Sequence, residues 1–439
     1  MKLKSALCCS VFICLTLSAC DSQLPETLTA GKETALPPTL VVPTEADPTS
    51  LPETEAPDPA VLPSGVLSMG KGTEGVRLTS LEGEVIDEFQ FPGFSLSGPS
   101  PDSSSRFHYG GTTQMGVVTS PCIFMTSISG DQSIAVHESK SPVINLQQLK
   151  GLIHLIGASG QPIIVFAAYD PENLNEFNNS RFSPSTEDES EPTRVPPVVN
   201  SWLYTASYKA SPASDLLLTR SDENGYGIYP LSLHMEGDVL KGVWYTLSYR
   251  GLFGGGPIVY TGFRGLYYLG AETNQEHEAL AVDQPFLGLS SSQRLIAYTI
   301  AGDGSEKTII IEGLGAGKLR EIPILPGTHP TGTGTALFSP LDTTLAWQEH
   351  YLGEEGVGIV FRFASTQKDG KLIEIDSHDL ISGTADPEVY HVRLAGWMDD
   401  QRIVFEAHGP EIVDLYILDM GNMSVSYLAP GAFIGFTYS

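Results

Sequence analysis

Short apolar segments, each preceded by a polar turn, recur along the chain from about residue 64 to the C-terminus. The clearest spans residues 339–347, where a Ser-Pro-Leu-Asp turn leads into an apolar run that ends on Trp347. Similar segments lie at residues 290–298, 397–405, 100–109, 211–218, 158–166 and 255–260, the last two keeping only a glycine-containing turn and the strand. Apolar runs bounded by turn residues are typical of buried β-strands. The pattern therefore predicts a β-rich chain built from a repeated unit.

Hairpins follow several of these segments. Residues 414–419 and 423–428 alternate apolar and polar positions on either side of a Met-Gly-Asn turn, and the same design occurs in three other places: 308–311 with 319–324, 265–269 with 278–282, and 76–79 with 85–89. Alternation around a Gly or Asn turn is the signal of a β-hairpin. Repeats at intervals of roughly 40 to 50 residues correspond to the four-stranded blades of β-propellers.

The polar turn of the Ser-Pro-Asp type, the apolar strand and the hairpin together resemble the WD-repeat-like blades of TolB-type and prolyl-oligopeptidase-type β-propellers. The resemblance covers most of residues 64–439, although a glycine seldom follows the turn aspartate and the copies near 166 and 260 are degenerate. It implies an all-β propeller of four-stranded blades. We expect seven blades, and eight if residues 142–200 form a further sector.

The C-terminal segment at residues 431–438 reads as a single strand after the last hairpin. We expect it to pair within the N-terminal blade, near residues 65–68, and to close the ring. Such pairing satisfies both strand edges and removes an aggregation hazard.

The first 20 residues have the features of a lipoprotein signal peptide. Lys2 and Lys4 precede an apolar run at residues 6–17 that is too short to span a bilayer, and the run ends in Leu-Ser-Ala-Cys at Cys20. This ending resembles the bacterial lipobox, in which the cysteine becomes the lipidated first residue. The resemblance implies cleavage after residue 19 and attachment through Cys20 to the extracytoplasmic face of a membrane in the bacterial cell envelope. An ordinary secretory signal is the alternative.

Two segments have the composition of disordered chain. Residues 20–63 form a linker rich in Pro, Thr and Glu that follows the signal peptide at 1–19. Within the propeller domain at 64–439, a polar and acidic insertion lies near residues 170–197. Neither has an apolar face that could offset the entropy of ordering. Weak calcium contact is the alternative role for the acidic insertion.

Overall composition limits the class of partner. The chain has 45 Gly and 31 Pro among 439 residues, which favours many turns and excludes a helical bundle. Its 24 basic and 52 acidic residues give a net charge of −28. Nucleic acid is excluded as a partner, because binding it requires clustered Lys and Arg.

Familiar catalytic motifs are missing from the sequence. It has no G-x-S-x-G, no H-E-x-x-H and no zinc-type Cys/His spacing, and we expect no cofactor, no metal and no catalytic residue. Ser365 and Lys368 match S-x-x-K but lie between two predicted strands, whereas the motif requires one helical face. The sequence thus favours a binding module with a protein or peptide partner. Two alternatives are a glycan-active hydrolase with paired carboxylates in the propeller channel and a sensor or assembly subunit of an envelope complex.

One aromatic-rich segment supplies candidate contact residues. Residues 244–268 hold eight aromatic residues, two arginines and a run of glycines. Aromatic residues and arginine are enriched at interfaces. The candidate contacts to a ligand or partner are Trp244, Tyr249, Arg250, Phe253 and Arg264. The alternative is that these residues belong to strands packed against their neighbours.

Overall fold

The computed structural model describes most of the C-terminal three quarters of the chain. The described residues are 62–69, 75–90, 95–99, 106–112, 121–127, 133–138, 151–156, 161–169, 198–207, 214–237, 239–249, 262–301, 307–326, 328–334, 336–353, 356–384, 388–410 and 412–437. All of them belong to one compact unit, Ser50–Ser439. The signal peptide, Cys20, nearly all of the linker and the insertion at 170–197 lie outside the described residues, so their assignments stay predictions.

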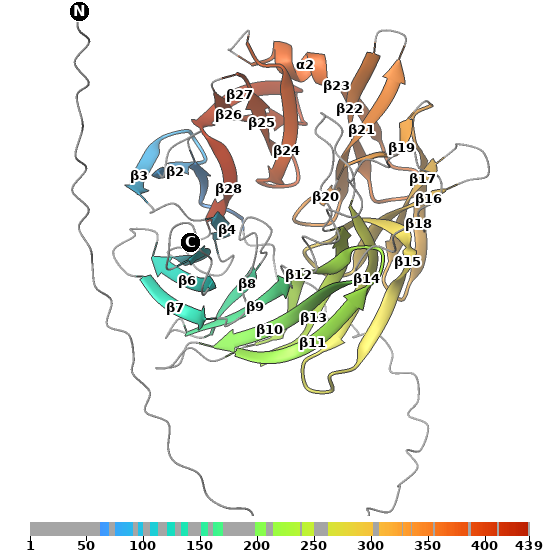
Figure 1. The fold of residues 1–439 in the computed structure, drawn as a ribbon. Helices are drawn as coiled ribbons and strands as arrows, with labels where there is room; N and C mark the ends of the chain where they lie inside the picture. The colour runs from blue at the N-terminus through green and yellow to red at the C-terminus, as the bar shows by residue number, and fades with distance from the viewer. Residues whose placement is uncertain are drawn as a thin grey trace, which may run out of the picture. The chain divides into compact units, whose positions relative to one another are not determined.

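Antiparallel β-sheets make up nearly all of the described structure (Figure 1). Sheet A contains β28 (Ala432–Thr437), β1 (Gly65–Met69), β2 (Gly75–Ser80) and β3 (Val85–Gln90). Sheet B contains β4 (Ser95–Pro99), β5 (Arg106–Thr112), β6 (Pro121–Ser127) and β7 (Ser133–Glu138). Sheet C contains β8 (Gly151–Ile156), β9 (Gln161–Tyr169), β10 (Val199–Ser207) and β11 (Ser214–Asp222).

The next sheet has seven strands in chain order: β12 (Tyr226–Glu236), β13 (Val239–Tyr249), β14 (Phe263–Gly270), β15 (Glu276–Leu289), β16 (Leu295–Ala301), β17 (Lys307–Gly313) and β18 (Gly317–Pro323). It consists of two four-stranded arrays that share β15. The first part of β15, from Glu276 to Leu280, pairs with β14, and its last part, from Phe286 to Leu289, pairs with β16. We refer to β12–β15 as array D and to β15–β18 as array E.

Two more sheets complete the described chain. Sheet F contains β19 (Thr328–Thr333), β20 (Leu337–Phe338), β21 (Thr344–Gly353), β22 (Gly356–Ser365) and β23 (Leu372–Asp376). Sheet G contains β24 (His391–Trp397), β25 (Arg402–His408), β26 (Val413–Asp419) and β27 (Ser424–Pro430). The described residues include one short helix, α2 (Ser377–Ser382). Asp376 caps its N-terminus, because the Asp376 side chain accepts a hydrogen bond from the His378 N–H. No helix in the described residues is long and apolar enough to cross a membrane.

Most of the predicted strands and hairpins are confirmed. The four expected hairpins are β26/β27, β17/β18, β14/β15 and β2/β3. The strands expected after a polar turn are the second strands of sheets B, C, F and G and of array E: β5, β9, β21, β25 and β16. The regular spacing of these five strands reflects the repeated order of strands within each sheet.

The phase of the repeat is wrong between residues 211 and 260. Leu216–Leu218 lies in β11, the fourth strand of sheet C, and does not begin a new array. Residues 211–213 lie outside the described residues, between β10 and β11 in the chain; serine and proline favour a turn at any hairpin and do not mark a particular one. The second strand of array D is β13, and residues 255–260 lie outside the described residues. Residues 142–200 contain β8 and β9, which belong to sheet C together with β10 and β11.

The polar turns link neighbouring sheets. Gln293 and Asp342 occupy the equivalent fourth positions of two such turns, and both have left-handed backbone, with φ of 59° and 58°. The Ser292 hydroxyl in the turn of array E donates to the Asp342 carboxylate in the turn of sheet F. The next turn, in sheet G, continues the series, since Asp400 Oδ1 accepts from the Leu341 N–H at 3.1 Å. The repeated polar turn is therefore a contact between adjacent units.

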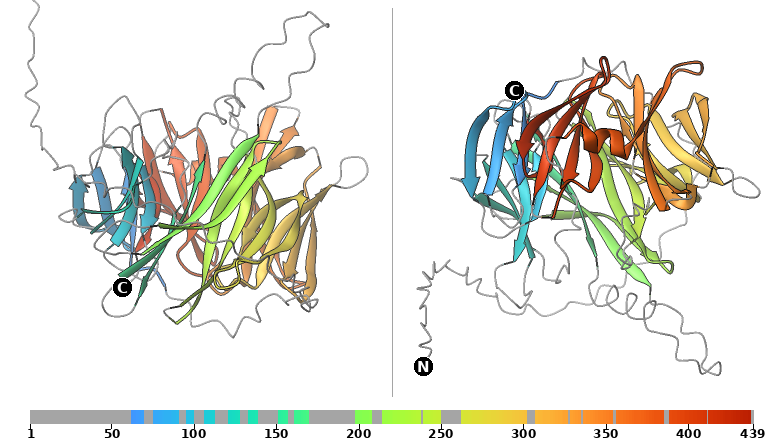
Figure 2. Two further views of the ribbon diagram at one scale, coloured as in Figure 1. Left: turned by 60° about the horizontal axis from the view of Figure 1, so that its bottom comes forward. Right: turned by 90° about the horizontal axis from the view of Figure 1, so that it is seen from above.

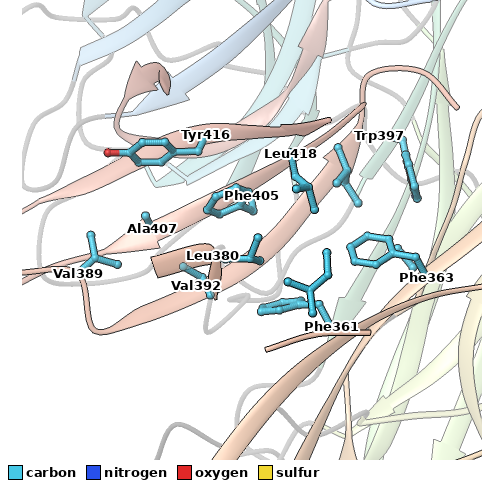
Figure 3. Packing of buried hydrophobic residues seen from close by; sticks show 13 residues of the cluster. Phe361, Phe363, Leu380, Val389, Val392, Trp397, Phe405, Ala407, Tyr416 and Leu418 are labelled. Carbon is cyan, nitrogen blue, oxygen red and sulfur yellow. The ribbon is translucent and has the colours of Figure 1, made fainter. Parts of the chain in front are cut away.

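Apolar clusters fill the spaces between consecutive sheets. Figure 3 shows the cluster between sheets F and G, where Phe361 and Phe363 of β22 pack against Phe405 of β25 and Trp397 of β24, with Leu380 of α2 at the side. Further clusters join sheet C to array D, array D to array E, and array E to sheet F. Burying each large side chain contributes about 2 kcal/mol relative to exposure. Side-chain packing between sheets therefore supplies the lateral cohesion of the described unit.

The C-terminal strand lies in the N-terminal sheet. Val66 of β1 pairs with Phe436 of β28, and Leu67 pairs with Gly435, so the two expected strands are neighbours. The Phe436 side chain also belongs to the cluster that joins sheet G to sheet A, together with Val404 and Leu415. In the right-hand view of Figure 2 the red strands of sheet G lie beside the blue strands of sheet A. The number of blades and the closure of a ring by this pairing stay predictions.

Deleting residues 432–439 should unfold the protein or make it aggregate. The deletion removes the whole of β28, exposes the edge of β1 and takes Phe436 out of its cluster. Circular dichroism melting and light scattering measure the effect. Removing only Tyr438 and Ser439, which follow β28, is the matched control and should leave the melting curve unchanged. An intact melting transition after the longer deletion would contradict the structural role of this strand.

Candidate functional site

Four polar side chains gather at one end of sheet G. His391 and Arg393 lie on β24, and Glu406 and His408 lie on β25. The antiparallel register pairs His391 with His408 and Arg393 with Glu406. Because alternate residues of a strand share a face, all four side chains belong to one face of the sheet. We call them the sheet G quartet.

Glu406 is the buried centre of the quartet. Its side chain is fully buried, and its Oε2 accepts from Arg393 Nε at 2.9 Å, Arg393 Nη2 at 2.6 Å and His408 Nε2 at 3.0 Å. Its Oε1 accepts from the Phe433 N–H of β28 at 2.8 Å. Burial alone raises the pKa of Glu406, but the His408 bond, the Arg393 charge and the Phe433 N–H together lower it below its usual value. The carboxylate is therefore ionised and fully bonded at neutral pH.

Arg393 combines a fixed inner edge with an accessible outer edge. Two of its guanidinium nitrogens hold Glu406, while the side chain as a whole is 53% exposed. The His391 and His408 rings lie with their centroids 5.6 Å apart. Burial, together with His408 and Arg393, lowers the pKa of His391 despite the opposing charge of Glu406. At the same end of the strand the Tyr390 side chain is 67% exposed, although its backbone N–H is bonded to the His408 carbonyl.

Sheet F places His350 close enough to His391 to interact with it electrostatically. Gln348 Nε2 and His350 Nε2 on β21 are 3.2 Å apart, and the His350 side chain is buried. His350 Nδ1 has no hydrogen-bond partner among the described residues. Burial and the proximity of His391 lower the pKa of His350 to about 4, so this ring is neutral at physiological pH.

A separate buried ion pair lies on the other face of β21. Arg362 Nη1 donates to Glu349 Oε1 at 2.8 Å and to the Pro323 carbonyl at 2.6 Å, and both charged side chains are almost completely buried. Trp347 Nε1 donates to the same carboxylate oxygen at 2.8 Å, and the Leu325 N–H donates to the other oxygen. Two of these bonds lie within sheet F: Trp347 to Glu349 and Arg362 to Glu349. The other two join sheet F to Pro323 and Leu325 at the end of array E. The pair therefore anchors sheet F to array E and faces away from the quartet.

Trp244, in the described part of the aromatic segment, contributes to packing. Trp244 is 2% exposed, donates from Nε1 to Gln293 Oε1 at 3.0 Å and packs against Tyr268. Arg264 lies on the neighbouring strand β14 and donates to the Asp283 carbonyl at 3.2 Å. Tyr249 is the last residue of β13, whereas Arg250 and Phe253 lie outside the described residues. The structure thus places Trp244 in the core, and ligand contact by the other four stays a prediction.

The sequence contains a signal for the quartet that residue spacing alone does not reveal. His-x-Arg at 391–393 and Glu-x-His at 406–408 flank one turn, and a register shift between Leu394 and Gly396 brings His391 opposite His408 and Arg393 opposite Glu406. Recognising the signal requires the register, because the histidines look dispersed along the chain. No group of three or more metal-ligating side chains occurs within the part of the chain that the structure describes. Ser365 ends β22 and Lys368 follows in a turn, so they share no helical face.

Comparisons with known proteins give a distant likeness in fold only. No family model and no curated protein matches the chain. Among solved structures, TolB from Acinetobacter baumannii aligns with 13% identity and a TM-score of 0.37 over 71% of this chain and 63% of its own. An oligogalacturonate lyase in complex with manganese aligns with 14% identity and a TM-score of 0.49 over 81% and 85%. The β-propeller domain of the Trilobed protease from Pyrococcus furiosus aligns with 11% identity and a TM-score of 0.42 over 84% and 97%.

The likeness of the chain to these three proteins is one of fold alone. The chain spans less than two thirds of the length of TolB. At such low identity, the evidence for the architecture is the chain's own succession of antiparallel four-stranded sheets, which is the organisation of propeller blades.

Replacing Glu406 with Gln should destabilise the protein by about 2 kcal/mol near neutral pH, because the charge-assisted bonds from Arg393 and His408 are lost. The folded pKa of Glu406 lies below the unfolded value of 4.5, so the carboxylate stabilises the fold above that pH. Its contribution declines as the pH falls below 4.5 through the folded pKa. Urea denaturation of the wild type and of Glu406→Gln should show that the difference between their free energies of unfolding becomes smaller as the pH falls below 4.5.

Glu88→Gln is the matched control. Glu88 pairs with Arg77 on the surface and its side chain is 57% exposed, so its loss should change stability by less than about 1 kcal/mol. If the free energies of unfolding of the wild type and Glu406→Gln differ by the same amount at every pH, the ionised state assigned to Glu406 is contradicted.

Proposed function

We propose that this protein is a lipid-anchored β-propeller of the bacterial cell envelope that binds a protein or peptide partner and carries out no chemistry of its own. The seven-bladed form is supported by sheets A, B, C, F and G together with arrays D and E. Ring closure is supported by the pairing of β28 with β1 and by the cluster between sheets G and A. Propellers present a broad face built from blade loops, which suits the recognition of another macromolecule.

The sheet G quartet is the observation that carries the binding function. It places an exposed arginine, held by a buried carboxylate, at one end of a sheet. Arginine is among the residues that most often supply binding energy at interfaces. A rigidly held arginine also costs less entropy on binding than a free one.

The state of Glu406 favours binding over acid–base catalysis. A general acid or base works best with a pKa near the operating pH and with access to the reacting proton. Glu406 instead has a lowered pKa, is buried, and has both oxygens occupied by donors. Its role is to position Arg393.

The lipid anchor supplies the membrane attachment. With a net charge of −28 the chain is repelled by an anionic membrane surface, so a basic patch does not hold it there. Buried acyl chains give about 0.8 kcal/mol per methylene, and two or more chains hold stably. Attachment through Cys20 therefore positions the protein at the membrane.

Cys20→Ser should move the protein from the membrane fraction to the soluble fraction of its native cell. The reason is that the serine hydroxyl cannot replace the thiol as the site of lipid attachment. Fractionation after a high-salt wash followed by immunoblotting measures the change. Cys14→Ser, within the segment expected to be removed, is the control and should stay in the membrane fraction. A Cys20→Ser protein that remains membrane-bound would contradict the anchor.

Crosslinking of the full lipidated protein in intact cells tests the binding function. A stoichiometric partner should be captured by the wild type, and capture should fall several-fold in Arg393→Gln because the exposed guanidinium is lost. Arg402→Gln is the matched control, since Arg402 is also paired with a carboxylate, Asp399, but lies at the other end of sheet G. A wild type without a stoichiometric partner, or one whose partner is lost equally in both variants, would contradict the proposal.

A further inference from the structure

We infer that the sheet G quartet binds a carboxylate group of the partner, held end-on by Arg393. This inference rests on the proposed binding function and names the chemistry that the site recognises. Its basis is the number and direction of the guanidinium donors that the described residues leave unused.

A guanidinium has five N–H donors in one plane. In Arg393, the Nε–H and one N–H of Nη2 are directed at the single oxygen Oε2 of Glu406. No acceptor among the described residues bonds to Nη1. The outer edge, formed by Nη1 and the second N–H of Nη2, therefore presents two parallel donors. This is the fork that binds the two oxygens of a carboxylate.

The inner edge of Arg393 on β24 is held by groups from two other strands. Glu406 on β25 is fixed by His408 of the same strand and by the Phe433 N–H of β28, and Arg393 itself is on β24. A ligand that binds the outer edge then finds the guanidinium already oriented. Preorganisation of this kind raises affinity by reducing the ordering cost of association.

Electrostatics favour a single negative charge in the ligand. The charges of Arg393 and Glu406 cancel, and the chain as a whole carries −28, so a dianion such as phosphate is repelled more strongly than a monoanion. The His391 and His408 rings beside Arg393 add groups that respond to an anion placed there.

Acetate and its neutral isostere acetamide are the probes that test this site on the whole protein. With isotope-labelled histidine, the imidazole NMR signals of His391 and His408 should shift saturably with acetate, with half-saturation at about 1 to 10 mM for so small a ligand. Acetamide should give no saturable shift. Signals that respond equally to both probes, or that never saturate with acetate, would overturn the inference.

Three variants separate the fork from general charge. Arg393→Gln should raise the acetate concentration at half-saturation at least about tenfold, since a charge-assisted pair of bonds is lost. Arg393→Lys keeps the charge without the fork and should bind several-fold more weakly than the wild type. Arg402→Gln should bind as the wild type does. Undiminished binding in Arg393→Gln or Arg393→Lys, or an equal loss in Arg402→Gln, would overturn the assignment to Arg393.

Failure of this inference is distinguishable from failure of the proposed function. If the wild type captures a partner in the crosslinking experiment but acetate does not bind, the carboxylate assignment is wrong and the binding function stands. If acetate binds as described and no partner is captured, the carboxylate site stands and the protein-binding function is wrong. Peptides with a free or an amidated C-terminus then identify whether the carboxylate is the chain end or a side chain of the partner.

Discussion

The pairing of β28 with β1 is the constraint on which the remaining structure depends. Ser64 and Thr437 are bonded across a sequence separation of 373 residues, and joining chain ends that far apart costs on the order of 5 kcal/mol in loop-closure entropy. The cost is offset by the ladder between the two strands and by the apolar cluster that Phe436 enters. The same strand brings the Phe433 N–H to Glu406. The geometry around Arg393 is consequently set by residues from opposite ends of the described chain.

Contacts between sheets are of two physical kinds. Most are apolar, as between sheets F and G, and depend only on shape and buried area. The contact between array E and sheet F also contains the Arg362 and Glu349 pair, whose burial is costly unless each charge is well bonded. Here Trp347, Leu325 and Pro323 supply partners for both oxygens of Glu349 and for Arg362 Nη1, whereas Arg362 Nε has none among the described residues. Such a pair tolerates little change in geometry and so defines how these two units meet.

Much of the β architecture is predictable from local pattern, because alternation and turn residues act over a few positions. β21, β16 and β25 each follow a polar turn, and their hairpin partners follow in order. The assignment failed at Leu216, since a Ser-Pro turn is equally suited to the hairpin between β10 and β11. The N-terminal lipobox is a separate local signal, read by other proteins, on which the fold of the sheets has no bearing.

The candidate site was harder to predict than the strands. Aromatic content drew attention to Trp244, yet the burial of a strand residue depends on which neighbouring sheet covers it, and that is not a local property. The quartet depends on register: a shift of one residue between β24 and β25 would send Arg393 and Glu406 to opposite faces. Its role also needs the Phe433 N–H of β28, a strand that pairs with β1 at the other end of the described chain.

Because arrays D and E share β15, they are joined to each other in a different way from sheets F and G. Arrays D and E are joined through one continuous backbone, from Glu276 to Leu289, whereas sheets F and G meet through side chains. Loss of side-chain packing would leave arrays D and E still connected through the backbone of β15, whereas the described sheets F and G share no strand.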